Sequence, residues 1–301
     1  MRPRPSSFLP QWRSFQQLRS NATQAAPSLI NVKNIPAPHL GIIRILSLNR
    51  PKARNAISKQ LLAELNYHVD SIYEEKGVGT TRALILASEV DSCFCAGADL
   101  KERAGFTQQE TTQFLTSLRQ TFTNISNLPI PTITALSSVA FGGGLELALT
   151  THLRVFASTT IVALPETRLA IIPGAGGTYR LPALIGINRA RDLILTGRRV
   201  SGPEAYFLGL CDRLVEVLPE EELEKNRGKA REKVLEEAVR LAKEICQGGP
   251  VATGAALRAV DQCARGQEAE NEAYGSVVDT EDKHEALRAF AEKRLPVFKG
   301  K

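Results

Sequence analysis

The chain of 301 residues is 43% hydrophobic and 23% charged, an ordinary globular composition that can bury a sizeable core. No run approaches the roughly 18 apolar residues that a membrane-spanning helix needs, which argues against an integral membrane protein. Five Cys without paired spacing argue against a disulfide framework or a zinc site and favour a reducing compartment. The net charge of +6, in contrast, favours nucleic acids or other anionic ligands.

The positive charge is concentrated at the N-terminus. Residues 1–26 contain four Arg and several Ser but no acidic residue, and the first acidic residue of the chain is Glu64. Because the segment also lacks a continuous apolar run, it is predicted to be a mitochondrial transit peptide that directs the protein to the matrix. A disordered basic tail is the alternative. The remaining residues hold 34 basic and 32 acidic side chains, a net charge of +2.

Apolar periodicity in the following segments predicts strands and helices in alternation. They are strands over 41–48, 81–87, 131–136 and 153–157, and helices that follow a cap at Ser58 and extend over 107–127. The strand over 81–87 is almost entirely apolar, so we expect it to be buried on both faces. This order is typical of an α/β unit built from stacked crossovers.

The chain beyond Gly177 is predicted to contain helices and no further strand. The helices are expected over 187–196, 202–209, 230–247, 250–265 and 281–293. The resulting division is a transit peptide over 1–26, an α/β core over 27–200 and a helical C-terminal region over 201–301.

Three loops carry the residues that are best suited to chemistry. They are Phe94–Arg103, Phe141–Leu149 and Leu164–Thr178. In the second loop three glycines follow a strand and open a helix, where backbone N–H groups and the helix dipole favour an oxyanion. Gly97 of the first loop can direct a second N–H group toward the same oxygen, and two such donors stabilise an enolate.

Two of these loops, the second and the third, also carry one carboxylate each. Glu146 falls in the first turn of the Gly-rich helix, and Glu166 follows Pro165 just after a strand. A partly desolvated carboxylate is tuned for proton transfer, so the pair can add water to a polarised double bond. The alternative is structural, with Glu146 favouring the helix dipole and Glu166 pairing with Arg168. The four His lack the spacing of metal ligands, and Cys93 and Cys95 are expected to be packing residues.

The chain from about residue 40 onward resembles the enoyl-CoA hydratase (crotonase) family. The motifs that carry the resemblance are Asn49–Ala56, Phe94–Asp99, Gly142–Glu146, Pro165–Glu166, Ile172–Thr178, Ala205–Leu210 and Ala289–Arg294, in this order. The resemblance implies a core of ββα turns that form a spiral, followed by a helical C-terminal trimerisation region. It also implies assembly as a homotrimer or a dimer of trimers.

The resemblance assigns roles to the loops. It implies that the N–H groups of Ala98 and Gly143 form an oxyanion hole for a thioester carbonyl. Glu146 matches the carboxylate that deprotonates water, and Glu166 matches the acid that protonates the α-carbon. Members that only isomerise double bonds typically keep one acid, so the presence of both Glu favours a hydratase over a Δ-isomerase.

The resemblance also implies where coenzyme A binds. Lys52, Arg54 and Lys101 match the positions that contact its phosphates, and such cations suit a ligand with several phosphate charges. The loop over 96–101 matches the adenine and pantetheine path. Its residues besides Lys101 that we expect to contact coenzyme A are Ala96, Ala98, Asp99 and Leu100. Coenzyme A is part of the substrate, and we expect no metal and no separate cofactor.

Within the family, the segments 97–104 and 166–173 most resemble mitochondrial methylglutaconyl-CoA hydratases of leucine breakdown, some of which bind AU-rich RNA. In those RNA binders a Lys-rich helix follows the Asn-Ala motif, whereas here the segment 58–77 has two Lys against four acidic residues. Because RNA binding needs charge that neutralises phosphate, we do not expect it here. A methylglutaconyl substrate requires a cation near its distal carboxylate, and Arg168 is a candidate.

Overall fold

The computed structural model describes residues 27–218 and 228–301, so the predicted transit peptide lies outside the described residues. The strands are β1 (Ile30–Pro36), β2 (Ile42–Leu48), β3 (Thr81–Ser88), β4 (Cys93–Cys95), β5 (Thr132–Leu136), β6 (Val139–Phe141), β7 (Leu153–Ala157), β8 (Ile161–Ala163), β9 (Val200–Ser201) and β10 (Arg213–Val215). They form a large sheet in the order β1-β2-β3-β5-β7-β10 and a small sheet in the order β4-β6-β8-β9. Apart from the antiparallel pairs β1-β2 and β8-β9, neighbouring strands are parallel.

The helices complete a repeated ββα unit. The α-helices are α1 (Lys59–Tyr73), α2 (Leu100–Arg103), α3 (Gln108–Ser126), α4 (Gly143–Ala148), α5 (Gly177–Ile185), α6 (Ile187–Thr196), α7 (Gly202–Leu208), α8 (Lys229–Ile245), α9 (Pro250–Asp261), α10 (Gln267–Gly275) and α11 (Glu281–Glu292). Short 3-10 turns are η1 (Pro51–Ala53), η2 (Glu166–Leu169) and η5 (Cys263–Arg265). In the turns β3-β4-α3, β5-β6-α4 and β7-β8-α5, the first strand joins the large sheet and the second the small sheet. This confirms the expected spiral.

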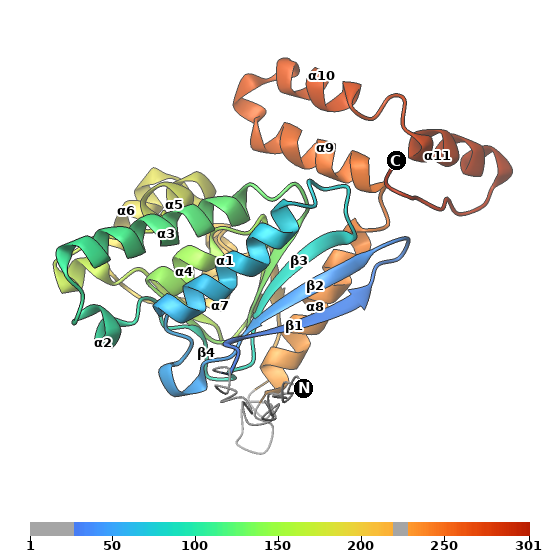
Figure 1. Ribbon diagram of the computed structural model, residues 1–301. Coiled ribbons are helices and arrows are strands. Elements are labelled where there is room, and N and C mark those ends of the chain that lie inside the picture. Colours follow the sequence, from blue (N-terminus) through green and yellow to red (C-terminus); the bar gives the residue numbers. More distant parts are fainter. Residues whose placement is uncertain (1–26, 219–227) are drawn as a thin grey trace, which may run out of the picture.

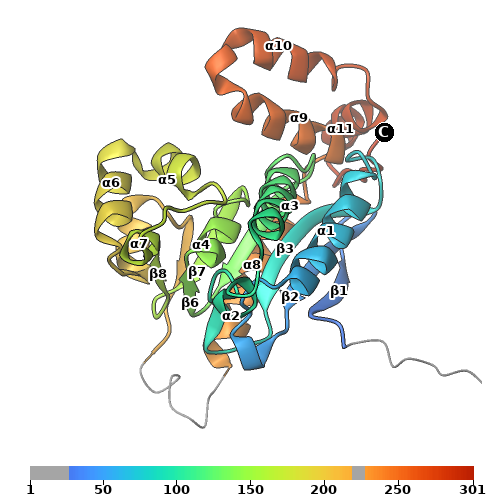
Figure 2. The same cartoon turned by 60° about the vertical axis from the view of Figure 1, so that its left-hand side comes forward.

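Apolar side chains cover both faces of the large sheet. Ile43 and Ile45 of β2 pack in one cluster with residues of α8, and Leu46 and Leu48 belong to a second cluster with residues of α1 and α3. Figures 1 and 2 accordingly show α1 and α3 on one face and α8 on the other. The predicted burial of β3 on both faces is confirmed, since its residues alternate between the same two clusters.

Most predicted elements are present near their expected bounds, including the cap of α1, where the Ser58 hydroxyl accepts a hydrogen bond from the Leu61 N–H at 3.2 Å. The prediction that no strand follows Gly177 is wrong. β9 pairs with β8 and β10 extends the large sheet beside β7. These strands are two and three residues long, too short to show a period in the sequence. The helix α10 was also not predicted.

The expected helical C-terminal region is confirmed. In Figure 1, α9, α10 and α11 project from the sheet-containing body, while α8 packs against the sheet. The projecting helices and the segment after α11 leave large apolar side chains in solvent, among them Phe290 at 85% exposure and Leu295 at 87%. Within the described residues, no helix has the length and apolar character needed to cross a bilayer.

Candidate active site

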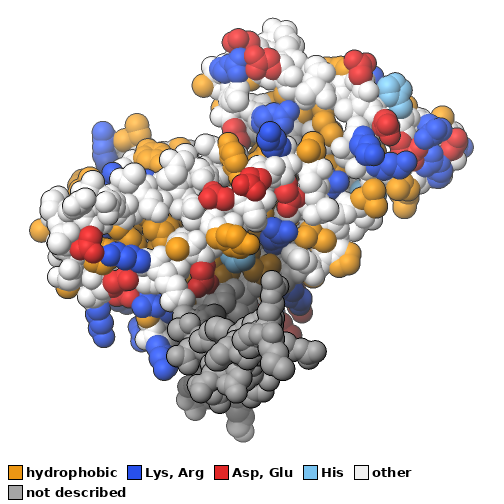
Figure 3. All heavy atoms as spheres, viewed as in Figure 1, with side chains coloured by type: hydrophobic (Ala, Val, Ile, Leu, Met, Phe, Trp, Pro, Cys, Tyr) orange, Lys and Arg blue, Asp and Glu red, His pale blue; other side chains and the backbone are white. Residues whose placement is uncertain are grey.

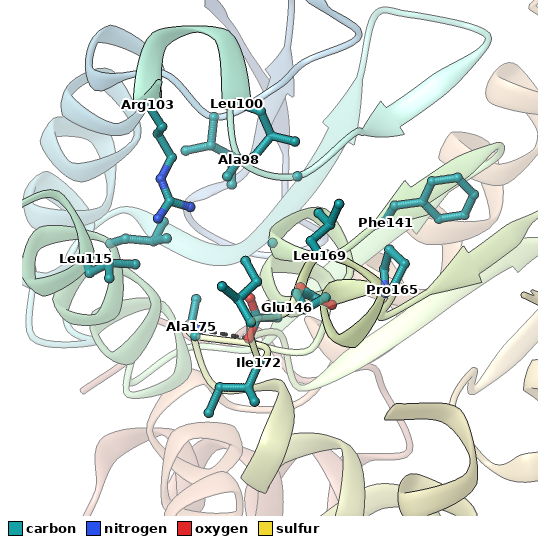
Figure 4. A pocket seen from close by; sticks show the side chains of 18 of the residues that line it. Ala98, Leu100, Arg103, Leu115, Phe141, Glu146, Pro165, Leu169, Ile172 and Ala175 are labelled. Atoms are coloured by element: carbon teal, nitrogen blue, oxygen red, sulfur yellow. Dashed lines mark hydrogen bonds between the residues drawn. The ribbon is translucent and has the colours of Figure 1, made fainter. Parts of the chain in front are cut away.

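All three predicted loops meet at one pocket with a volume of about 470 Å³. Figure 4 shows side chains from α2, α3 and the loops around β6 and η2 converging on it. The lining residues are Ile57, Ala96, Gly97, Ala98, Leu100, Arg103, Leu115, Leu118, Arg119, Phe141, Gly142, Gly143, Glu146, Pro165, Glu166, Leu169, Ile171, Ile172, Gly174 and Ala175. The pocket therefore contains both predicted carboxylates and both predicted N–H donors.

The backbone amides of Ala98 and Gly143 lie close together. A methyl group built on Gly97 would lie 3.3 Å from the Gly143 nitrogen, and one built on Gly143 would lie 3.7 Å from the Ala98 nitrogen. Within residues 27–218 and 228–301, neither N–H donates a hydrogen bond to another protein group. Two unused donors on the wall of one pocket are suited to a single oxygen that gains negative charge.

Glycine is required for this approach at two positions. Gly97 has φ of +93°, and a side chain there would place its Cβ 2.7 Å from the carbonyl oxygen of Phe141. A Cβ on Gly144 would collide with the backbone of Cys95, so α4 can pack against β4 only when this residue is glycine. The glycine motifs thus bring the two loops into backbone contact.

Glu146 reaches the pocket from the first turn of α4. It is 3% exposed, and its Oε1 accepts hydrogen bonds from the backbone N–H groups of Ala175 (Figure 4) and Gly177, each at 2.8 Å. Burial raises the pKa of Glu146, while these two N–H donors favour the ionised form and oppose the shift. The carboxylate therefore interacts with the start of α5. The structural alternative for Glu146 considered only the dipole of its own helix.

Glu166 begins the turn η2 and is 8% exposed. Its Oε1 lies against Gly142, where an added Cβ would be only 2.9 Å away. Its Oε2 is buried and has no hydrogen-bond partner in the described part of the chain. Burial raises the pKa of Glu166 to about 7, and the nearby charge of Glu146 adds to the increase. This carboxyl is therefore largely protonated at slightly acid pH.

Arg168 does not pair with Glu166, and this alternative is wrong. The Nε and Nη2 atoms of Arg168 donate to the carbonyl oxygen of Thr196 at 3.1 and 2.9 Å, and the side chain is exposed. Arg168 also does not line the pocket that contains Glu146 and Glu166. It is therefore not the cation that would bind the distal carboxylate of a methylglutaconyl substrate in this pocket.

The buried side-chain amide of Asn55 supports the loop Phe94–Arg103, a role that the sequence did not predict. Asn55 is fully buried, and its Oδ1 accepts a hydrogen bond from the Arg50 N–H at 2.7 Å. Its Nδ2 donates to the Ser88 hydroxyl and to the Phe94 carbonyl oxygen, both at 2.9 Å. Asn55 therefore ties the segment after β2 to the strand that leads into Gly97 and Ala98.

The side wall of the pocket was also not predicted from the sequence. Leu115 and Leu118 fall in the helix that the sequence predicts over 107–127, and both line the pocket. Arg103 and Arg119 line it as well. Helical spacing shows which residues share a face but not that the middle of α3 borders a cavity, so the sequence held no direct signal for this wall.

The predicted coenzyme A contacts divide into two groups. Ala96, Ala98 and Leu100 line the pocket, whereas Lys52, Arg54 and Lys101 are exposed and lie outside its lining. The Asp99 side chain is already engaged.

Asp99 caps α2 by accepting the Glu102 N–H at 3.1 Å and pairs with Arg50 at 2.6 Å. Burial by itself would raise the pKa of Asp99, but the hydrogen bond from Arg50 and the backbone donors of α2 lower it overall. Its backbone is engaged as well, since its N–H donates to the Ile57 carbonyl oxygen at 3.2 Å and its carbonyl oxygen accepts the Arg103 N–H at 2.9 Å. Asp99 therefore holds the loop in place and does not line the pocket.

The described residues contain no group of His, Cys, Asp and Glu arranged to hold a metal ion. Cys93 and Cys95 are buried in β4, in agreement with their expected role as packing residues. On the face shown in Figure 3, Lys and Arg side chains are interspersed with Asp and Glu, and the described part of that face has no continuous basic surface.

Comparison with known proteins shows the family and the fold of the chain. The sequence profile of the enoyl-CoA hydratase/isomerase family matches residues 40–301. The chain is 62% identical to an enoyl-CoA isomerase/hydratase of Zymoseptoria tritici, covering 91% of this chain and 89% of that protein. It is 57% identical to a mitochondrial methylglutaconyl-CoA hydratase of Pyricularia oryzae, covering 93% and 89%. The crystal structure of an enoyl-CoA hydratase from Bacillus anthracis superposes with a TM-score of 0.81 at 39% identity, covering 91% of this chain and all of that one.

Proposed function

Because the chain belongs to the enoyl-CoA hydratase/isomerase (crotonase) family, we propose that it adds water across the double bond of an α,β-unsaturated acyl-CoA thioester. The observation that carries this proposal is the pair of buried carboxyls, Glu146 and Glu166, in one pocket with two unused backbone N–H groups. Hydration requires both a proton acceptor and a proton donor, together with a site for developing negative charge.

The two N–H groups would hold the thioester oxygen. As the water oxygen bonds to the β-carbon, the electron pair of the double bond moves toward the thioester and forms an enolate. The N–H groups of Ala98 and Gly143 then carry stronger hydrogen bonds than in the ground state, which lowers the barrier. Losing one such donor typically costs about a hundredfold to a thousandfold in rate.

The carboxyls would move two protons. Glu146 takes a proton from water as its oxygen attacks the β-carbon, and Glu166 gives a proton to the α-carbon. The enolate electrons form the new C–H bond, so the net change is the addition of H and OH to the two carbons. Exchange between the carboxyls and water restores the starting protonation.

The hydrogen bonds support this division of roles. Two backbone donors at 2.8 Å stabilise the negative charge of Glu146, as a base requires. Glu166 has a buried oxygen without a partner and a pKa raised to about 7 by burial, which suits an acid that is protonated before reaction.

Isotope labelling tests the reaction class. The purified protein is incubated with crotonyl-CoA in water enriched in oxygen-18, and the thioester products are analysed by mass spectrometry. We expect a 3-hydroxyacyl thioester that carries one labelled oxygen. A second incubation uses 3-enoyl-CoA. If its double bond moves and neither 3-enoyl-CoA nor crotonyl-CoA gains labelled oxygen, the result contradicts hydration and indicates a Δ-isomerase.

We further propose a methylglutaconyl thioester as the substrate and the mitochondrial matrix as the location. The support is the name of the Pyricularia oryzae relative and the Arg-rich, acid-free composition of residues 1–26. A panel of crotonyl-, longer enoyl- and methylglutaconyl-CoA tests the substrate, with the highest kcat/KM expected for methylglutaconyl-CoA.

The exposed apolar side chains of the C-terminal helices support our proposal of a homotrimer or a dimer of trimers. Val260, Tyr274, Leu287, Phe290 and Leu295 are each more than half exposed in a single chain. Apolar surface of this kind typically becomes buried at an interface between protein chains. Light scattering during size-exclusion chromatography should give three or six times the mass of one chain, and a monomer would contradict the assembly.

A further inference from the structure

Arg103 is a cation in the pocket wall that has no acidic partner in the described part of the chain. It is the last residue of α2, and Figure 4 shows its side chain reaching from that helix into the pocket toward Leu115. Its guanidinium carbon lies 5.9 Å from the centre of the Phe114 ring. No hydrogen bond or ion pair among the described residues involves its guanidinium group.

The neighbouring arginines differ from Arg103 in this respect. Arg50 pairs with Asp99 at 2.6 Å. Arg119 donates to the carbonyl oxygen of Gly174 at 2.7 Å, and Arg180 donates to that of Ala175 at 2.9 Å. Each of these guanidinium groups has an acceptor that fixes it within the protein. Arg103 keeps all five of its N–H donors for a ligand.

The surroundings of Arg103 indicate the kind of ligand. Leu100, Leu115 and Leu118 line the same wall, so the guanidinium stands among apolar side chains that suit a hydrocarbon chain. The cations that are free to meet phosphates, Lys52, Arg54 and Lys101, lie outside the pocket lining. A planar guanidinium binds a carboxylate through two parallel hydrogen bonds, and this bond strengthens where water is displaced.

We propose that Arg103 binds a carboxylate at the far end of the acyl group and thereby selects acyl-CoA substrates that carry one. The inference rests on the proposed function, because it places the acyl group in this pocket. A substrate that ends in a methyl group would leave the guanidinium desolvated and without an acceptor. The pocket therefore favours the dicarboxylic substrate by gaining a charged hydrogen bond and by avoiding an unpaired cation.

Matched thioesters with and without the carboxylate test the inference. Glutaryl-CoA and butyryl-CoA are saturated and differ only by that group, so calorimetry measures their binding without any reaction. We expect the wild-type protein to bind glutaryl-CoA about 10- to 100-fold more tightly, and R103M to lose this preference. R103K keeps the charge but not the planar fork and should retain part of the preference.

The unsaturated pair, glutaconyl-CoA and crotonyl-CoA, extends the test to turnover. R103M should reduce the ratio of their kcat/KM values by a similar factor. K101M, two residues before Arg103 in α2, should change kcat/KM for both substrates by one common factor because both contain coenzyme A. A thermal melt of each variant confirms that it is folded.

Two results would overturn the assignment of Arg103. One is an equal decrease of affinity and kcat/KM for both members of each thioester pair in R103M, which indicates contact with a coenzyme A phosphate. The other is an R103M variant that keeps the full preference for the thioester with the carboxylate. Failure of the proposed function is distinguishable from either result. In that case the wild-type protein hydrates neither unsaturated thioester, while the binding measurement with glutaryl-CoA and butyryl-CoA still reports on Arg103.

Discussion

The two sides of the pocket place the same side chain in different electrostatic surroundings. On the α4 side, Glu146 accepts two backbone N–H groups from the start of α5. On the η2 side, Glu166 has a buried oxygen with no partner in the described residues. Burial raises the pKa of both groups, so burial alone does not distinguish them. Two backbone N–H donors oppose the rise in the pKa of Glu146, whereas the charge of Glu146 adds to the rise in the pKa of Glu166. This difference favours an ionised Glu146 beside a protonated Glu166.

Removing either carboxyl should have the largest effect. We expect E146Q and E166Q each to lower kcat for hydration by about 10²–10⁴-fold, the usual contribution of a general base or acid. Gln keeps nearly the same volume, so both variants should remain folded in a thermal melt. Full hydration activity in E146Q would show that Glu146 is not the base, and the assigned difference in role between Glu146 and Glu166 would be wrong.

A change that separates the two loops tests the part of the pocket that both carboxyls share. G97A places a Cβ 2.7 Å from the Phe141 carbonyl oxygen and moves the Ala98 N–H away from that of Gly143. We expect kcat to fall about a hundredfold, as for the loss of one oxyanion donor. G105A is the matched control, because its Cβ would lie 3.7 Å from the nearest atom, the carbonyl oxygen of Glu102. Equal activities of the two variants would contradict this account.

The pH profile should show the two carboxyls separately. Glu166 must be protonated to act, and its pKa is raised by burial to about 7. The value of kcat/KM for hydration should therefore decrease about tenfold per pH unit above this value. It should also decrease in acid, where Glu146 becomes protonated. A profile that keeps rising above pH 8 would contradict the role of Glu166 as an acid.

Stability should respond to the same group. The pKa of Glu166 is raised from its ordinary 4.5 to about 7 by burial, so the native state binds this proton more tightly than the unfolded chain does. Its stabilising contribution is complete below about pH 4.5 and is lost as the pH rises to about 7. The melting temperature of E166Q relative to wild type should thus increase between pH 5 and pH 8. A constant difference would exclude a raised pKa.

The exposed cations should have the smallest effects. K52M, R54M and K101M should each raise KM for crotonyl-CoA by a few-fold, with little change in kcat, because exposed ion pairs contribute about 1 kcal/mol or less. The effect should shrink in high salt. E236Q on α8, far from the coenzyme A positions, serves as an exposed charge control. A large decrease of kcat in K101M would show that this residue acts within the pocket.

The sequence indicated Glu146, Ala98 and Gly143 beside glycines and Glu166 directly after Pro165, and the family resemblance assigned their roles. Side-chain direction has no such local signal. Arg168 was a candidate for the pocket because it is two residues from Glu166, yet its guanidinium donates to the Thr196 carbonyl oxygen.

The same limit applies to the fold. Long elements such as α1, α3 and α8 show their apolar period, whereas β9 and β10 are defined by pairing with β8 and β7. Asn55 illustrates a further limit, since its buried hydrogen bonds to Ser88 and Phe94 join segments that are distant in the chain. Such contacts exist only in the folded protein.

Infrared difference spectroscopy tests the assigned protonation of the two carboxyls most directly. A protonated buried carboxyl has a C=O stretch that an ionised one lacks. We expect the wild-type protein to show this band at pH 6 and to lose it as the pH passes about 7, where burial places the pKa of Glu166. The band should be absent in E166Q and present in E146Q. A band that persists in E166Q and disappears in E146Q would contradict the assignment.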